Sequence, residues 1–135
     1  MSQNIRVRDC MSRDSYQIAV TASVDEAARA LQHHRLPGAP VVDEQKRLVG
    51  FVSEHDLLHQ VLQASYHCDG GVTVQDVMRT EVLSVSPNDD IVELINVMVR
   101  PDKPKVFPVL EGRKVIGIIT RGLLLQALLE NRTRC

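Results

Sequence analysis

Residues 48–53 read Leu-Val-Gly-Phe-Val-Ser, and residues 115–120 read Val-Ile-Gly-Ile-Ile-Thr, with the same apolar pattern around a glycine. Both stretches are rich in apolar and β-branched residues and end on a hydroxyl side chain, which is typical of a strand that leads into a capped helix. The second stretch lies 67 positions after the first. The feature that decides the fold is therefore an internal repeat.

Three further pairs of segments keep the offset of 67 positions. They include the pattern Val-x-Asp-x-Met and the apolar positions of two helical stretches. The matched segments are 7–11 with 74–78, 24–31 with 91–98, and 57–62 with 124–129. Only the stretch around Pro40 and Pro108 drifts, to an offset of 68. A register kept over four segments predicts a tandem duplication of about 65 residues.

Periodicity within each repeat predicts the order β-α-β-β-α. Ser23, with Glu26 three residues later, forms a capping box before a helix whose apolar residues recur at i, i+3, i+4 and i+7. The counterpart of this helix is expected to begin near Asn88 or Asp89. The last helix of each repeat is expected to follow a strand directly. The predicted strands are 16–20, 39–43 and 48–53 in the first repeat, and 82–85, 106–111 and 114–120 in the second.

Composition excludes several classes of protein. The chain has 135 residues, of which 44% are hydrophobic and 24% charged, with a formal net charge of -1. Because the bases form no dense block, nucleic acid is not an expected partner. No apolar stretch reaches the ~20 residues that span a bilayer, and the N-terminus lacks the apolar region of a signal peptide. The three cysteines are far apart, which argues against a disulfide framework. We therefore expect a cytoplasmic protein without a membrane partner. The cysteines are Cys10, Cys68 and Cys135.

These motifs, in this order and twice over, resemble the CBS (cystathionine β-synthase) domain family. The resemblance rests on the element order, the Val-x-Asp-x-Met opening, the Pro-Val-Val-Asp strand and the strand that ends Gly-x-x-Ser/Thr. Two consecutive copies resemble a Bateman module. The resemblance implies an α/β (α+β) fold in which two repeats, residues 1–66 and 67–135, pack through their sheets about a pseudo-two-fold axis as one compact module.

The resemblance also implies an adenine nucleotide in the cleft between the repeats. The family pattern Gly-x-x-Thr/Ser-x-x-Asp is complete at residues 50–56. It assigns Asp56 to the ribose hydroxyls and Ser53 to a phosphate. A carboxylate can accept hydrogen bonds from both hydroxyls of a cis-diol, and a helix N-terminus favours an anion. The residues that match the adenine contacts of the family are Ile18, Ala19, Gly38, Ala39 and Pro40.

The second repeat departs from the family pattern. Leu123 stands where the ribose-binding Asp is expected, although Thr120 keeps the hydroxyl for a phosphate contact. An unpaired ribose hydroxyl beside Leu123 would cost about 1–3 kcal/mol. Arg121 could still reach a phosphate. We therefore predict two unequal sites.

Other interpretations of the same residues stay open at this point. Ser53 and Asp56 also suit the N-terminus of a helix, as a cap and a first-turn acid. His55 and His59 share a helix face, but no third ligand has a defined spacing, so no metal site is expected. The cations at residues 33–35 suit a helix C-terminus or, alternatively, the edge of a phosphate site. Gly50 and Gly117 are expected to allow close packing against the partner sheet.

The leading hypothesis is a non-enzymatic sensor that binds AMP, ADP, ATP or a related adenosyl ligand and requires no cofactor. Leucines on more than one face of residues 53–65 and 120–130 predict a homodimer through these helices. The output would pass to an effector protein in another chain. The alternatives are a structural or interaction subunit with an empty cleft and, more distantly, a metal-dependent enzyme.

Overall fold

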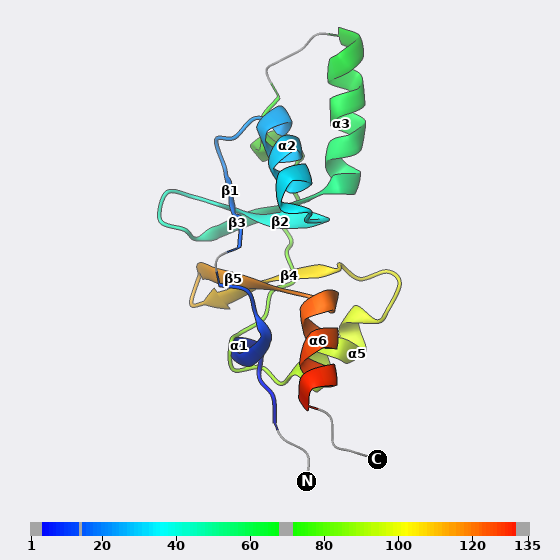
Figure 1. Ribbon diagram of the computed structural model, residues 1–135. Helices are drawn as coiled ribbons and strands as arrows, with labels where there is room; N and C mark the ends of the chain where they lie inside the picture. The colour runs from blue at the N-terminus through cyan, green and yellow to red at the C-terminus, as the bar shows by residue number, and fades with distance from the viewer. Residues whose placement is uncertain (1–3, 14, 68–71, 132–135) are drawn as a thin grey trace. The chain divides into compact units, whose positions relative to one another are not determined.

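The computed structural model describes residues 4–13, 15–67 and 72–131, which form a mixed α/β fold (Figure 1). Cys68 and Cys135 lie outside these residues, as does most of the loop between the repeats. The predicted α/β class is confirmed. The elements are α1 (Val7–Cys10), β1 (Ile18–Ala19), α2 (Val24–His34), β2 (Gly38–Val42), β3 (Leu48–Ser53), α3 (Glu54–His67), α4 (Val74–Val77), α5 (Ile91–Met98), β4 (Val106–Glu111), β5 (Lys114–Thr120) and α6 (Arg121–Asn131).

The chain divides into two compact units that do not follow the order of the repeats. The first unit comprises residues 16–82 and 113–115, and the second comprises residues 1–15, 83–112 and 116–135. Each repeat therefore contributes its short opening helix to the other unit. The repeat boundary at residues 66 and 67 and the pseudo-two-fold packing stay predictions.

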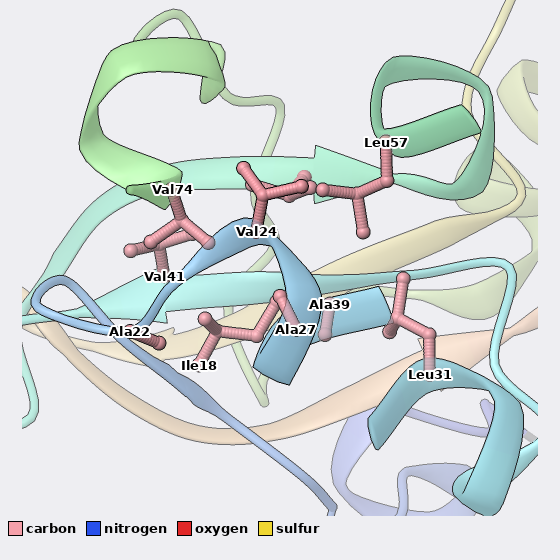
Figure 2. Close-up of a cluster of buried hydrophobic side chains, with 10 residues drawn as sticks. Ile18, Ala22, Val24, Ala27, Leu31, Ala39, Val41, Leu57 and Val74 are labelled. Carbon is pink, nitrogen blue, oxygen red and sulfur yellow. The ribbon is translucent and has the colours of Figure 1, made fainter. Parts of the chain in front are cut away.

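The first unit is a three-stranded sheet with α2 and α3 on one face (Figure 1). Strand β1 runs parallel to β2, and β2 runs antiparallel to β3. Helix α2 begins as predicted, because the Ser23 side chain accepts a hydrogen bond of 3.0 Å from the Glu26 N–H. Its apolar stripe faces the sheet and forms the core shown in Figure 2. The core residues are Ile18, Ala22, Val24, Ala27, Leu31, Ala39, Val41, Val52, Leu57 and Val74.

Helix α4, which the second repeat contributes to the first unit and which we call an exchanged helix, completes this core. Val74 is fully buried, and its N–H donates to the Ala22 carbonyl at 3.0 Å. The chain then leaves α4 along β3, where Arg79 and Phe51 exchange two backbone hydrogen bonds of 2.9 Å. The Val-x-Asp-x-Met motif is thus a buried anchor followed by a short strand-like contact.

The second unit repeats this arrangement with a smaller sheet. Strands β4 and β5 form a two-stranded sheet, and α1 anchors in the core through the fully buried Val7. After α1, Ser12 and Ile118 exchange backbone hydrogen bonds of 2.9 and 3.0 Å. The core residues are Val7, Ile91, Leu94, Met98, Phe107, Val109, Ile119 and Leu124.

Two sequence predictions are corrected in the second unit. The strand expected at 82–85 is reduced to a single bridge between Val85 and Val109, and the turn in which the Ser86 N–H donates to the Asp89 carboxylate ends the pairing after Val85. That turn also occupies Asp89, so α5 begins later than expected. Asp90 is its N-cap and accepts from the Val92 N–H at 2.8 Å. The strand expected at 16–20 is likewise limited to β1.

None of the helices within the described residues has the length and apolar character that crossing a membrane requires.

Candidate functional site

Ser53 and Asp56 form a reciprocal cap at the point where β3 passes into α3. The Asp56 N–H donates to Ser53 Oγ at 3.2 Å, while the Ser53 N–H and hydroxyl both donate to Asp56 Oδ2, at 3.3 and 2.9 Å. This is the capping-box arrangement, with Asp in place of the usual Glu. The interpretation of these two residues as a helix cap is therefore confirmed.

Arg79 completes the surroundings of the Asp56 carboxylate. Its Nε lies 3.2 Å from Oδ2 and its Nη2 lies 3.2 Å from Oδ1, so the guanidinium forks across both oxygens. The Asp56 side chain is 17% exposed and the Arg79 side chain 65% exposed. A mostly solvated cation therefore covers a mostly buried anion.

Asp56 is ionised at neutral pH. Partial burial by itself raises the pKa of the Asp56 carboxyl, but the hydrogen bonds from Arg79 and Ser53, together with the Arg79 charge, outweigh that effect. The net pKa lies below the ordinary value for Asp. The site thus presents a charged acceptor at the start of a helix.

The strand register places some predicted adenine contacts beside this cap. Gly38 pairs with Ser53, Ala39 with Val52 and Pro40 with Phe51 across β2 and β3. A Cβ atom at Gly38 would lie 2.7 Å from the Phe51 ring, so this contact requires glycine.

Burial separates the predicted adenine contacts into two groups. The side chains of Ile18, Ala39 and Pro40 are enclosed in the core of the first unit, whereas Ala19 is exposed. Gly38 is buried as well, so among these five residues Ala19 alone has an exposed surface.

The equivalent position in the second unit has different chemistry. Thr120 Oγ1 accepts a hydrogen bond of 3.2 Å from the Leu123 N–H, which caps α6 from one side only. The Leu123 side chain has no carboxylate that could accept hydrogen bonds from Thr120, as Asp56 does from Ser53. Arg121 is exposed in the first turn of α6. By the offset of 67, Ser12 stands where the first unit has Arg79. Both charges of the Asp56–Arg79 pair are thus missing together.

Gly50 and Gly117 allow a close approach, but not of the partner sheet that was expected. A Cβ at Gly50 would lie 2.5 Å from Met78 Sδ and 2.9 Å from the Arg79 carbonyl. A Cβ at Gly117 would collide with the backbone of Ser12. The segment that follows α4 lies directly on β3 at Gly50, and the segment that follows α1 lies directly on β5 at Gly117. Each glycine leaves room for that segment because it has no Cβ atom.

The histidines do not gather into a metal site in the part of the chain that is described. There, no three His, Cys, Asp or Glu residues are grouped so that they could hold a metal ion. His59 Nε2 lies 3.1 Å from the Gln63 side-chain nitrogen, and the His34 ring stacks on Tyr16 with centroids 4.9 Å apart. The stacking gives His34 a structural role at the end of α2.

Arg79 is the site residue that sequence reasoning missed. It lies 23 positions after Asp56 and belongs to the other repeat, so no local motif joins them. The signal was present in the repeat itself. The two units differ at both equivalent positions, with Leu123 in place of Asp56 and Ser12 in place of Arg79.

Comparison with known proteins places the chain in a family. The pattern of the CBS domain matches it twice, at residues 7–63 and 74–130. The chain belongs to the CBS domain family. It is a tandem CBS pair, as the repeat and its motifs predicted.

Solved CBS pairs have the same fold over nearly the whole chain. The CBS-pair protein CBSX2 from Arabidopsis thaliana superposes with a TM-score of 0.85 at 27% identity, covering 98% of this chain and 100% of that one. A crystal structure of CBSX2 in complex with AMP gives a TM-score of 0.81 at 29% identity, covering 95% and 98%.

Curated relatives of this CBS pair are longer proteins. The uncharacterized protein MJ1232 of Methanocaldococcus jannaschii is 28% identical over 123 residues, which cover 91% of this chain and 39% of that protein. The chloroplastic CBS domain-containing protein CBSX1 of Arabidopsis thaliana is 28% identical, with 87% of this chain and 60% of that protein covered.

Proposed function

We propose that this CBS pair is a non-enzymatic regulatory module that binds AMP, ADP, ATP or a related adenosyl ligand, with the ribose at Asp56. The observation that carries the proposal is the ionised, mostly buried Asp56 carboxylate beside the Ser53 hydroxyl at the start of α3. Ionised acceptors make strong hydrogen bonds to hydroxyl donors, and a helix N-terminus favours a nearby phosphate. That CBSX2 has been crystallised with AMP supports the same ligand class.

The proposed site is built mainly by the first unit. Gly38, Ala39 and Pro40 bring backbone next to Ser53, and Ile18 and Ala19 lie on the neighbouring strand β1. Thr120 and Arg121 stay proposed phosphate contacts from the second unit. Because Leu123 offers no acceptor, the proposal assigns one strong ribose site to each chain.

The proposed module acts as a homodimer in the cytoplasm and passes its response to an effector protein in another chain. Helices α3 and α6 support the dimer, because both expose leucines that a monomer would leave in water. The exposed leucines are Leu58, Leu62, Leu125, Leu128 and Leu129.

A structural subunit with an empty cleft is the second candidate. It is favoured by the enclosure of Ile18, Ala39 and Pro40 in the core and by the missing acid at Leu123. The two candidates differ in whether any adenosyl ligand stabilises the folded protein.

A thermal-shift panel separates these candidates, because a ligand that binds only the folded state raises the melting temperature. The panel contains AMP, ADP, ATP, inorganic phosphate and 2′-deoxy-AMP, which lacks one ribose hydroxyl. We expect a shift with at least one ribonucleotide, a smaller shift with its deoxy analogue, and none with phosphate. No shift with any nucleotide would favour the structural subunit.

A further inference from the structure

We propose that Arg79 makes the Asp56 site selective for adenosine ligands that carry an anionic phosphate. Arg79 pairs with the Asp56 carboxylate, and it releases the carboxylate when a phosphate binds the guanidinium. This inference rests on the proposed function and names the ligand class and the residue that selects it.

The carboxylate is already occupied by donors. Oδ2 accepts from the Ser53 N–H, the Ser53 hydroxyl and Arg79 Nε, and Oδ1 accepts from Arg79 Nη2. A carboxylate offers about four lone-pair positions in all. A ribose diol needs two of them, and the two donors from Ser53 already use the other two. The diol therefore competes with the Arg79 fork, while the Ser53 cap can stay in place.

Only the side chain of Arg79 is free to respond. Its backbone N–H and carbonyl are both bonded to Phe51 at 2.9 Å, and Gly50 lets this segment lie directly on β3. The Arg79 side chain, in contrast, is 65% exposed. When the fork withdraws from Asp56, the guanidinium therefore stays within one side-chain length of the bound ribose.

The charge on the ligand then decides whether binding compensates for the lost Arg79–Asp56 contact. A neutral nucleoside displaces the fork and leaves the guanidinium with water alone. A nucleoside phosphate offers it a new anion, and arginine pairs with phosphate through the same bidentate geometry. A ligand with a positive sulfonium group would meet like charge. The expected order of affinity is AMP, then adenosine, then a cationic adenosyl compound.

The second unit has neither the carboxylate nor the arginine at the positions equivalent to Asp56 and Arg79. Ser12 and Leu123 stand at the positions of Arg79 and Asp56, so that unit has neither the acceptor nor its competing cation. Competition between an arginine and a ribose for one carboxylate is accordingly a property of the first unit.

Calorimetric titration of AMP and adenosine into wild type, Arg79→Gln and Arg29→Gln tests this inference. Arg29→Gln is the matched control, because it removes a cation that pairs with Asp25 on the exposed side of α2 in the same unit. In Arg79→Gln we expect adenosine to bind about two- to fivefold more tightly, since an exposed competitor is gone. We expect AMP to bind about tenfold more weakly, since its guanidinium partner is gone. Arg29→Gln should keep the wild-type ratio.

Arg79→Lys guards against a variant that folds poorly. It keeps the charge without the fork, so its ratio of AMP to adenosine affinity should lie between those of wild type and Arg79→Gln. If AMP binds the wild type and the ratio is the same in all variants, or if both ligands weaken in Arg79→Gln, this inference is wrong while the proposed function stands. If wild type binds neither AMP nor adenosine, this inference is wrong, and the proposed function is wrong as well if no nucleotide of the thermal-shift panel binds.

Discussion

At the scale of single residues, Asp56 joins the start of α3 to the segment that follows α4. Its carboxylate caps the helix through Ser53 and holds Arg79, and these bonds depress its pKa in the folded protein. A depressed folded pKa means that the carboxylate adds stability above its unfolded pKa. That stability is lost as the pH falls through the lower, folded value.

The pH dependence of folding should therefore change in Asp56→Asn. Between pH 7 and about pH 3, below the usual carboxyl pKa of about 4, the free energy of unfolding should fall more in wild type than in the variant. Urea unfolding at both pH values measures the difference. The pKa of Asp43 is also lowered, chiefly by a hydrogen bond from the Arg47 N–H. Asp43 therefore adds the same pH-dependent loss of unfolding free energy in both proteins, and this loss cancels when the two are compared. Equal losses in wild type and variant would show that the Asp56 bonds do not stabilise the fold.

The sequence predicted one half of this site and not the other. Ser53 and Asp56 are three residues apart, so local helix-capping chemistry was enough to place them together. The Asp56–Arg79 contact depends on the exchange of α4 into the first unit. No periodicity along the chain specifies which unit a four-residue helix joins. The burial of Ile18, Ala39 and Pro40 likewise depends on tertiary packing that residue types alone do not fix.

At the scale of elements, the two exchanged segments require glycine at equivalent positions of β3 and β5. Gly50→Ala and Gly117→Ala should each lower the free energy of unfolding by about 1–3 kcal/mol, as overpacked sites do. The loss should be larger at Gly117, because its added Cβ would lie 2.4 Å from the Ser12 carbonyl oxygen, whereas at Gly50 the Met78 thioether can move and the Arg79 carbonyl oxygen lies farther away, at 2.9 Å. Denaturant unfolding of the two variants measures both losses.

Gly122→Ala is the matched control for these variants. Its added Cβ meets nothing closer than Thr120 Oγ1 at 3.8 Å, and alanine in a helix is favoured over glycine by up to about 1 kcal/mol. Gly122→Ala should therefore stabilise the protein slightly. Unchanged stability in Gly50→Ala and Gly117→Ala would contradict the close packing of the exchanged segments.

Elements with strong local patterns were predicted closely, and weak ones were not. Strands β3, β4 and β5 have the predicted bounds, since apolar runs between turn residues define them. Pairing near the strand expected at 82–85 stops at Val85, where Asp89 competes for the next N–H, of Ser86, and a side-chain competitor of this kind is not visible in strand propensity. The four-residue helices α1 and α4 are too short to produce a periodic signal.

At the scale of the whole molecule, the exposed leucines of α3 and α6 predict a homodimer of twice the 15.1 kDa chain. Multi-angle light scattering at micromolar concentration measures the mass. Leu58→Glu and Leu125→Glu, at side chains that are 74% and 58% exposed, should give monomers because each places a charge in the proposed interface. Val92→Glu, at an apolar residue of α5 that is 59% exposed, should leave the dimer intact. A monomeric wild type would contradict the dimer.

The central claim is that the Asp56 carboxylate holds the ribose of an adenine nucleotide. Calorimetric titration of AMP into wild type, Asp56→Ala and Asp25→Ala tests it most directly, since Asp25 is an exposed acid of the same unit that also pairs with an arginine. We predict that wild type and Asp25→Ala bind AMP alike. Asp56→Ala should lose about 1.5–3 kcal/mol, or roughly ten- to a hundredfold in affinity. An Asp56→Ala protein that is folded and binds AMP as tightly as wild type would contradict the claim.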